Sequence, residues 1–483
     1  MKFRVVARFL AVIIFLISVC MLMPLAWAVK DRSSDIAAFG GSIALGSLFS
    51  LLLFSFSYNA QAKDMGTREA IAAVALAWVF ASLQGCLPYL LGGYVPSFTD
   101  AYFEAMSGFT TTGATILTNI EANPRGILMW RAQTQWLGGM GIVVLTIALL
   151  PMLGISVNQL FKAEAPGPVL EKISPRIQDI AIMLWKVYMG LTFLGIVALF
   201  AGGMSFYESI CHIFTAVSTG GFSPRNASVA AYNSSYFDWA LTFVMFLSAA
   251  NFNLHLLAIR NKTFSPYRDP EFGFYVKIVL AASLAVSFYL YVHGFSNTVL
   301  HALRYGTFQV VSIITTTGFV TADYSLWPPL TQVILLTLMF VGGCAGSTAG
   351  SVKCIRILVV FKQIGSEIKR CVHPHAALTI RVGDQKIENS MAASAASFIV
   401  LYVLIFVFSS IAVSATGQDM ITSFSAVATT LGNTGPGFGA VGPVNNFASQ
   451  PTTAKWIYSF CMLCGRLELY TVLVLFTRDT WHR

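Results

Sequence analysis

Runs of apolar residues, each long enough for one membrane crossing, recur along the whole chain and are separated by polar connections. A bilayer core about 30 Å thick is crossed by about 20 apolar residues in an α-helix. The pattern therefore predicts an all-α polytopic membrane protein with ten spans. Their approximate bounds are 5–29, 37–57, 70–92, 127–153, 180–202, 235–258, 272–294, 329–363, 393–416 and 454–477.

The composition agrees with this prediction and leaves no stretch for a soluble domain. Hydrophobic residues make up 56% of the chain and charged residues only 11%, whereas charged residues make up about 25% of typical soluble domains. The first span follows Lys2, Arg4 and Arg8 and ends in Ala26-Trp27-Ala28, as a secretory signal would. Its apolar run is longer than a signal core of about 7 to 15 residues, so we expect a retained anchor helix.

Lysine and arginine gather in alternate connections, which indicates the orientation of the chain. Basic residues accumulate on the cytoplasmic side of membrane proteins, so both termini are predicted to be cytoplasmic. The formal net charge of +9 follows from this asymmetry and from anionic lipid at the inner surface, and we expect no nucleic-acid binding. The inner basic residues are Lys63, Arg68, Lys162, Lys172, Arg176, Arg260, Lys262, Arg268, Lys353, Arg356, Lys362, Lys369, Arg370, Arg381, Lys386, Arg478 and Arg483.

Four long outer connections contain a Thr/Gly-rich segment at the same place in their order. The segments read FTTTGAT (109–115), STGGFS (218–223), TTTGFV (315–320) and LGNTGPG (431–437). A shared register of this kind predicts four degenerate internal repeats. The segments align on Gly113, Gly221, Gly318 and Gly435, with Thr111, Thr219, Thr316 and Asn433 two residues earlier and Ser107, Thr215, Ser312 and Thr429 six residues earlier.

The stretch before each Thr/Gly segment is too short to span a bilayer. We predict re-entrant half-helices there, because non-helical backbone at membrane depth is tolerated only where it is buried in protein or lines water. Each repeat is then a span, a pore half-helix, a filter segment and a second span. The half-helices are expected at 99–109, 205–217, 301–314 and 419–430.

The repeats divide the chain into five parts. Residues 1–66 are expected to form two N-terminal transmembrane helices that precede the pore. The four pore repeats follow, and the third is expected to contain a gate-like loop. Their bounds are 67–165, 166–262, 263–385 and 386–483.

The Thr/Gly segments have the chemistry of a cation filter. A potassium filter replaces the hydration shell of the ion with rings of backbone carbonyls, and glycine permits the positive-φ backbone that turns carbonyls inward. The alternative is that these small and hydroxyl residues only pack helices, which four copies in register disfavour. The expected ion-binding residues are Thr111, Thr112, Gly113, Thr219, Gly220, Gly221, Thr316, Thr317, Gly318, Asn433, Thr434 and Gly435, with K⁺ held by the carbonyls of the four aligned glycines.

Together these features resemble the Trk/Ktr/HKT cation transporters, and within that superfamily the TrkH-type bacterial potassium uptake subunits. The resemblance rests on the four one-glycine filters, on GGCAGST (342–348) and on GRLELYTVLVLFT (465–477). APGP (165–168) and RDPEF (268–272) extend it over nearly the whole chain.

The resemblance implies potassium transport across the bacterial inner membrane by a homodimer with one pore per subunit. It also implies a cytosolic TrkA-type regulatory partner that binds nucleotides. This chain has no G-x-G-x-x-G fingerprint after a strand and no P-loop, so any nucleotide effect would come from the partner, and we expect no organic cofactor here. The chain departs from the family pattern at Ala349-Gly350-Ser351 and at Thr317-Gly318, which leaves its preference for K⁺ over Na⁺ open.

Residues 342–351 combine two signals. Their G-xxx-G spacing is typical of close helix packing, whereas their small and hydroxyl residues disfavour a continuous helix. The residues alone allow either a continuous, closely packed helix or a loop. The resemblance favours a loop across the pore. We expect the third repeat to be the only one whose second span is interrupted in this way.

Arg466 and Glu468 in the last span are charged residues at membrane depth, which are usually functional. Arg466 either caps carbonyls of a neighbouring helix or places a positive charge below the filter, and the resemblance favours the second role. The expected gate residues are Gly346, Ser347, Thr348, Ala349, Gly350, Ser351 and Arg466.

Other functions fit the sequence less well. A Na⁺-coupled or Na⁺-permeable cation symporter is the main alternative. A secondary solute transporter would show two large halves, and we find no pairing of nucleophile and base that indicates an enzyme. The longest inner connection, 353–390, carries Lys369 and Arg370 and is the predicted docking site of the regulator.

Overall fold

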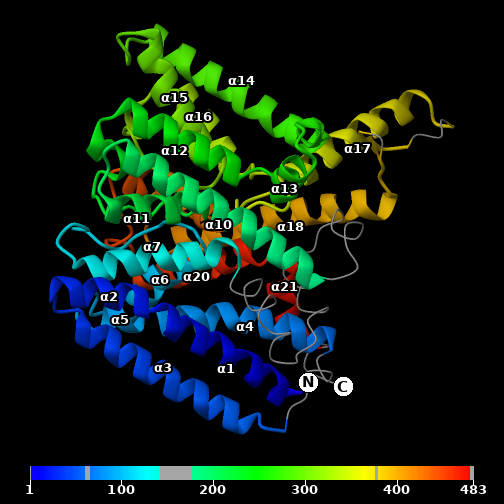
Figure 1. The fold of residues 1–483 in the computed structure, drawn as a ribbon. Coiled ribbons are helices and arrows are strands. Elements are labelled where there is room, and N and C mark those ends of the chain that lie inside the picture. Colours follow the sequence, from blue (N-terminus) through cyan, green and yellow to red (C-terminus); the bar gives the residue numbers. More distant parts are fainter. Residues whose placement is uncertain (1, 60–65, 142–176, 376–378, 384, 479–483) are drawn as a thin grey trace.

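The computed structural model describes residues 2–59, 66–141, 177–375, 379–383 and 385–478. Figure 1 shows these residues as stacked helices, with the N-terminal helices α1 to α5 at one edge and α14 to α16 at the opposite edge. The only strands in the described part are a hairpin of β1 (Arg381–Val382) and β2 (Gln385–Lys386). The segment 165–168 and the residues Lys63, Lys162, Lys172, Arg176 and Arg483 lie outside the described residues.

The N-terminal part and the first repeat lie side by side. Their helices pack through α1 against α3 and α4, and through α2 against α7. The helices are α1 (Phe3–Cys20), α2 (Leu22–Asp31), α3 (Ile36–Phe56), α4 (Thr67–Gly85), α5 (Leu87–Leu91), α6 (Phe98–Phe109) and α7 (Arg125–Gly139).

The second, third and fourth repeats follow the same order of long helix, short helix and second helix. The second repeat contains α10 (Ile177–Ala201), α11 (Phe206–Val217), η4 (Ser228–Tyr232), α12 (Ser235–Ser248), α13 (Phe252–Asn261) and η5 (Ser265–Arg268). The third contains α14 (Pro270–Val292), α15 (Val299–Ile314), η6 (Tyr324–Leu326), α16 (Pro329–Leu338) and α17 (Cys354–Val372). The fourth contains α18 (Asn389–Ser414), α19 (Met420–Gly432), η7 (Gly439–Val441), α20 (Thr452–Arg466), α21 (Leu469–Leu473) and η8 (Val474–Phe476).

The four expected half-helices are present as α6, α11, α15 and α19. Each begins at an N-cap whose side-chain oxygen accepts a hydrogen bond from a backbone N–H of the first turn. Such caps satisfy backbone donors that a helix start leaves without partners. The cap residues are Ser97, Ser205, Thr298 and Asp419.

The predicted architecture of a polytopic, mostly helical membrane protein is confirmed. Within the described residues, six helices are long and apolar enough to cross a membrane, or seven if the bent pair α12–α13 is taken as one span. The count of ten spans stays a prediction, because several expected spans are not single helices.

The expectation that only the third repeat has an interrupted second span is wrong. Helix α7 ends at Gly139, and Gly141 follows with a φ of 72°. Helices α12 and α13 meet at a bend of 94°, because the Asn251 side chain caps the new helix by accepting from the N–H of Asn253 at 2.9 Å. Helix α20 ends at Arg466, two residues before Glu468 with its φ of 57°. The predicted spans 235–258, 329–363 and 454–477 are therefore broken, and 127–153 is helical only to Gly139 within the described residues.

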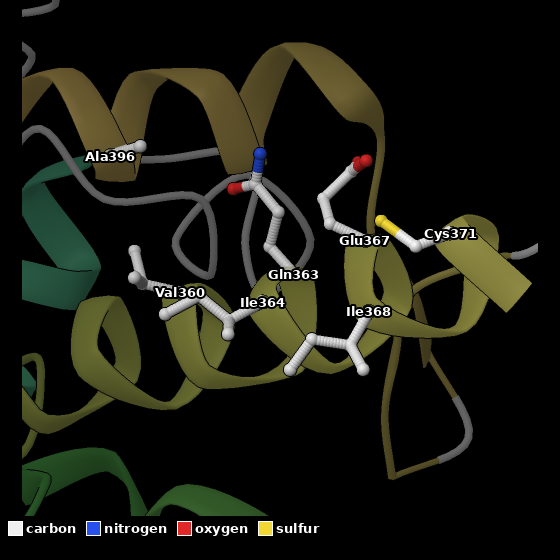
Figure 2. A pocket seen from close by; sticks show the side chains of 7 residues that line it. All are labelled: Val360, Gln363, Ile364, Glu367, Ile368, Cys371 and Ala396. Atoms are coloured by element: carbon white, nitrogen blue, oxygen red, sulfur yellow. The ribbon is translucent and has the colours of Figure 1, made fainter.

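Helix α17 projects from the bundle beside α18 (Figure 1). A shallow, mainly apolar hollow runs between the two helices, and Figure 2 shows the side chains that line it. Phe361 and Ile368 are exposed on α17. The lining residues are Val360, Gln363, Ile364, Glu367, Ile368, Cys371 and Ala396.

Candidate functional site

Each half-helix is followed by a residue with left-handed backbone, two positions before the aligned glycine. The angle φ is 54° at Thr111 and Thr219, 57° at Thr316 and 54° at Asn433. Left-handed backbone is unusual for β-branched residues and costs about 1–3 kcal/mol per residue. Three threonines in this state at one position indicate that the tertiary structure imposes the conformation.

One backbone hydrogen bond closes each half-helix and starts the filter segment. The N–H of the residue before the glycine donates to a carbonyl oxygen five residues earlier, at 2.8 to 2.9 Å, as in a Schellman helix end. The acceptors are the aligned hydroxyl residues, whose carbonyl groups are used in all four repeats. The bonds join Thr112 to Ser107, Gly220 to Thr215, Thr317 to Ser312 and Thr434 to Thr429.

The four aligned glycines form a closed ring. Their φ angles are 82° at Gly113, 75° at Gly221, 80° at Gly318 and 97° at Gly435. A Cβ atom at any of them would collide with a carbonyl oxygen of the next repeat. The facing carbonyls are Gly220 for Gly113, Thr317 for Gly221, Thr434 for Gly318 and Thr112 for Gly435. These contacts lead from the first repeat to the second, third and fourth and back to the first. The four segments therefore surround a single axis.

The helices pack in the same cyclic order. Helix α7 of the first repeat contacts α11 of the second, α12 of the second contacts α15 of the third, and α20 of the fourth contacts α6 of the first. Each of these second helices thus supports the half-helix of the following repeat.

Polar side chains of the half-helices contact the segment that follows each glycine. Glu104 accepts from the N–H of Ile116 at 2.9 Å, His212 Nε2 lies 3.2 Å from the Ser223 hydroxyl, and Gln309 accepts from the N–H of Thr321 at 3.3 Å. These three residues stand nine positions before their glycines. In the fourth repeat, Ser425 accepts from the N–H of Phe438 at 3.0 Å. A half-helix side chain therefore contacts the segment after the glycine in every repeat, through the backbone N–H in three of them.

Arg131 on α7 joins the first two repeats. It forms an ion pair with Glu104 at 2.8 Å, and both side chains are almost fully buried. It also donates to the carbonyl oxygen of Ser223 at 3.1 Å and to the hydroxyl of Thr115 at 3.1 Å. The charge of Arg131 is thus paired with Glu104, and the residue also lines the hollow beside the four aligned glycines.

A hollow outside the ring is lined by all four glycines together with Arg225. The guanidinium of Arg225 lies 2.7 Å from Glu208 and 3.7 Å from Glu121. Arg225 is therefore balanced by two carboxylates, and Arg131, the second arginine that lines this hollow, is paired with Glu104.

Residues 339–353 form a non-helical crossing between α16 and α17. Left-handed backbone occurs at Gly346 and Ser351, with φ of 72° and 57°. The N–H of Cys344 donates to Ala249 at 2.8 Å, and Gly346 accepts from the N–H of Phe252 at 3.1 Å. The segment 342–351 is thus a loop that fills the break between α12 and α13.

The loop touches the underside of the filter. The N–H of Gly350 donates to the Thr316 hydroxyl at 2.7 Å. The Thr348 hydroxyl donates to the carbonyls of Val217 and Ser248, each at 3.1 Å. Because Thr316 is the left-handed residue of the third repeat, the loop and the filter share a direct contact.

Arg466 lies where the loop, the filter and α7 meet. Its Nη1 donates to the carbonyl oxygen of Thr348 at 2.9 Å and to the Thr111 hydroxyl at 3.4 Å. Its Nη2 donates to the carbonyls of Gly138 and Gly139 at 2.5 and 2.7 Å. The side chain therefore caps a neighbouring helix, one of the two roles considered for it, and also reaches the loop.

Anchors on the other side hold both ends of the loop. Buried Glu271 accepts from the N–H groups of Ala345 at 2.7 Å and Ile355 at 3.0 Å, and Lys353 donates to the carbonyl of Ala349. Glu468, two residues after Arg466, pairs with Arg356 at 2.6 Å.

The whole chain matches known proteins. The sequence profile of the TrkH family, described as "Cation transport protein", matches residues 37–290 and 295–482. The chain belongs to the TrkH family. It is 38% identical to the Trk system potassium uptake protein TrkH of Salmonella typhimurium and 37% identical to that of Escherichia coli K12, over the full length of each pair. The crystal structure of the potassium transporter TrkH from Vibrio parahaemolyticus has a TM-score of 0.89 at 35% identity, with both chains fully covered.

In this member of the TrkH family, all twelve filter residues expected from the sequence lie in the four segments that make up the ring. Six of the seven expected gate residues lie in the loop, and the seventh, Arg466 at the end of α20, bonds to Thr348 of the loop. Sequence reasoning missed Glu104, Gln309 and the loop anchor Glu271. The constant distance of nine residues from Glu104, His212 and Gln309 to their glycines was the signal that could have identified these half-helix side chains.

Proposed function

We propose that this chain conducts K⁺ across the bacterial inner membrane through the ring formed by Gly113, Gly221, Gly318 and Gly435. The closed order of glycine-to-carbonyl contacts is the observation that carries the proposal. It supplies four backbone segments around one axis, which is the geometry in which carbonyls replace the hydration shell of a cation. The related TrkH and TrkG proteins are named as potassium uptake proteins.

K⁺ itself is the transported ion, and the chain needs no organic cofactor for this role. In each repeat a single glycine takes the position, so we propose a short filter. The carbonyls of the four glycines and of the residues before them bind the ion.

Loop residues 346–351 and Arg466 act as a gate below the filter. The support is geometric, because the loop contacts Thr316 above and Arg466 beside it. A guanidinium adds a positive charge at this level, which raises the barrier for a cation. Opening requires the loop to release these contacts.

The functional unit is a homodimer with a cytosolic TrkA-type regulatory subunit that binds nucleotides, and both chain termini face the cytoplasm. The regulator docks on the inner connection 353–390, which starts directly after the loop. Movement of α17 (Cys354–Val372) would then be transmitted to the gate without crossing the filter.

Ion flux into liposomes containing only this protein tests the proposal. We expect K⁺ to enter faster than Na⁺. Equal rates, or faster entry of Na⁺, would favour the alternative of a Na⁺-permeable or Na⁺-coupled transporter and contradict the proposed filter.

A further inference from the structure

The filter of the second repeat differs from the other three at one position. The residue before the aligned glycine is Thr112, Thr317 or Thr434 in the first, third and fourth repeats, but Gly220 in the second. A glycine there has more backbone freedom than a threonine. A filter whose carbonyls must stay in place therefore needs another constraint on this segment.

Threonine side chains supply that constraint in two of the repeats. The hydroxyl of Thr112 pairs with that of Thr110 at 2.9 Å, and the hydroxyl of Thr317 pairs with that of Thr315 at 2.8 Å. These bonds tie the filter segment back to the end of its own half-helix. Gly220 has no side chain with which to make such a bond.

Gln135 of α7 occupies the missing side chain's space. A Cβ atom at Gly220 would lie 2.6 Å from Oε1 and 2.8 Å from Nε2 of Gln135, so a threonine and Gln135 cannot both be present without rearrangement. Gln135 is fully buried, and its position depends on packing inside the protein.

Both ends of the Gln135 amide bind the filter backbone. Nε2 donates to the carbonyl oxygen of Gly220 at 2.7 Å, and Oε1 accepts from the N–H of Phe222 at 3.0 Å. The two bonds lie on either side of Gly221. They fix the direction of the Gly220 carbonyl, the group that faces Gly113 in the ring.

The other repeats have no equivalent amide in this register. Counted four residues before the aligned small residues Gly139, Ala249, Gly343 and Gly465, the counterparts of Gln135 are Met245, Met339 and Cys461. The one repeat that lacks the threonine is thus the one that receives a glutamine from its neighbour.

We propose that Gln135 is a selectivity-determining positioning residue, which replaces the missing threonine at position 220 and holds the second-repeat carbonyl in the filter. This inference rests on the proposed function of the ring. It assigns a role in ion discrimination to a residue outside the four filter segments.

The test compares K⁺ and Na⁺ flux in liposomes for Gln135→Met and for a matched control, Gln133→Met. Gln133 lies on the same helix, is also buried, and donates to the carbonyl oxygen of Cys20 at 2.8 Å, away from the filter. We expect Gln135→Met to lower the K⁺/Na⁺ flux ratio by about fivefold or more, as loss of one to two hydrogen bonds would. Gln133→Met should keep the ratio of the unchanged protein. If the K⁺/Na⁺ flux ratio of Gln135→Met stays within about twofold of that of the unchanged protein, the proposal is overturned.

A double variant, Gln135→Ala with Gly220→Thr, provides the reciprocal test. Restoring the threonine and removing the glutamine should return the ratio to within about threefold of the unchanged protein, whereas Gln135→Ala alone should not. If Gln135→Met does not fold, the double variant decides: folded, selective protein supports the proposal, and failure to fold or to discriminate overturns it.

Gly318→Ala separates this inference from the proposed function. If Gly318→Ala keeps full discrimination, the ring is not the filter and the proposed function fails. If Gly318→Ala loses discrimination but Gln135→Met does not, the filter stands and only the role of Gln135 fails.

Discussion

The hydroxyl of Thr316 accepts a hydrogen bond from the backbone N–H of Gly350 at 2.7 Å. Thr316 belongs to the ring of Thr/Gly segments and Gly350 to the loop beneath it, so this bond joins the two parts directly. Both residues are buried, and a buried N–H that loses its acceptor costs about 1–3 kcal/mol.

Thr316→Val should therefore loosen the loop. The change keeps the shape of the side chain and removes the acceptor, so we expect K⁺ flux without a regulator to rise about fivefold or more. Flux into liposomes measures this. Thr331→Val is the control, because the Thr331 hydroxyl donates to the carbonyl of Pro328 near the start of α16, within its own turn. Equal flux in both variants would show that the Thr316 bond does not hold the loop.

Arg466→Ala should also raise flux without a regulator. The change removes a positive charge and the bond to the Thr348 carbonyl, while the filter carbonyls remain. We expect a rise of about tenfold, the effect of about 1.4 kcal/mol on a barrier, with little change in the K⁺/Na⁺ ratio. Arg125→Ala, which removes an arginine paired with Asp31 away from the loop, should leave flux unchanged. Deleting residues 346–351 should act in the same direction as Arg466→Ala, and unchanged flux in both would argue against a gate.

Alanine at Gly318 should abolish discrimination between K⁺ and Na⁺. The residue has a φ of 80°, and a Cβ there collides with the Thr434 carbonyl, which is backbone and cannot turn away cheaply. Gly190→Ala is the control, because a Cβ at Gly190 meets nothing within 4 Å. The flux ratio should fall for the first variant and stay constant for the second. Equal ratios in both variants would contradict the filter.

The ion pair of Glu104 and Arg131 should dominate the stability of the outer filter. Arg131→Met leaves a buried carboxylate without its partner, which typically costs about 3–5 kcal/mol. We expect a markedly lower thermal midpoint of the purified protein in detergent. The double change Glu104→Gln with Arg131→Met should recover part of the loss, and a single variant as stable as the unchanged protein would show that the pair is dispensable.

Charge reversal at Lys369 and Arg370 should weaken docking of the regulator. Both lie in the last turn of α17, and attraction between exposed charges falls as salt screens it. Binding of a TrkA-type subunit, measured at low and high ionic strength, should lose affinity and salt dependence together. If affinity and salt dependence stay the same, the docking site lies elsewhere.

The repeated parts of the fold were predictable because they repeat. The half-helices at 98–109, 206–217, 299–314 and 420–432 differ by no more than two residues at either end from the bounds expected from the sequence. Four copies gave independent support for the register of the glycines, so one weak motif became a strong one.

The breaks in the second helices were not predictable from apolar runs. The apolar runs continue through Ala249 and through Leu467. A hydropathy average over about 20 residues therefore predicts one unbroken span at 235–258 and another at 454–477. At the first break Asn251 caps a new helix, and at the second Glu468 has a positive φ and bonds to Arg356. Gln135 was missed for a similar reason, since its partner Gly220 is 85 residues away.

The four half-helices have a further electrostatic effect through their direction. Each starts at a capped residue and ends at the ring, so the carbonyl ends of α6, α11, α15 and α19 converge on the axis. The end of one helix carries about half a unit of negative charge, and four together place about two units around the space beneath the filter. Under the proposed function, we expect a cation in this space to be stabilised by peptide dipoles. Arg466 bonds to Thr111 at the end of α6, so its positive charge lies in this negative field and cancels part of it.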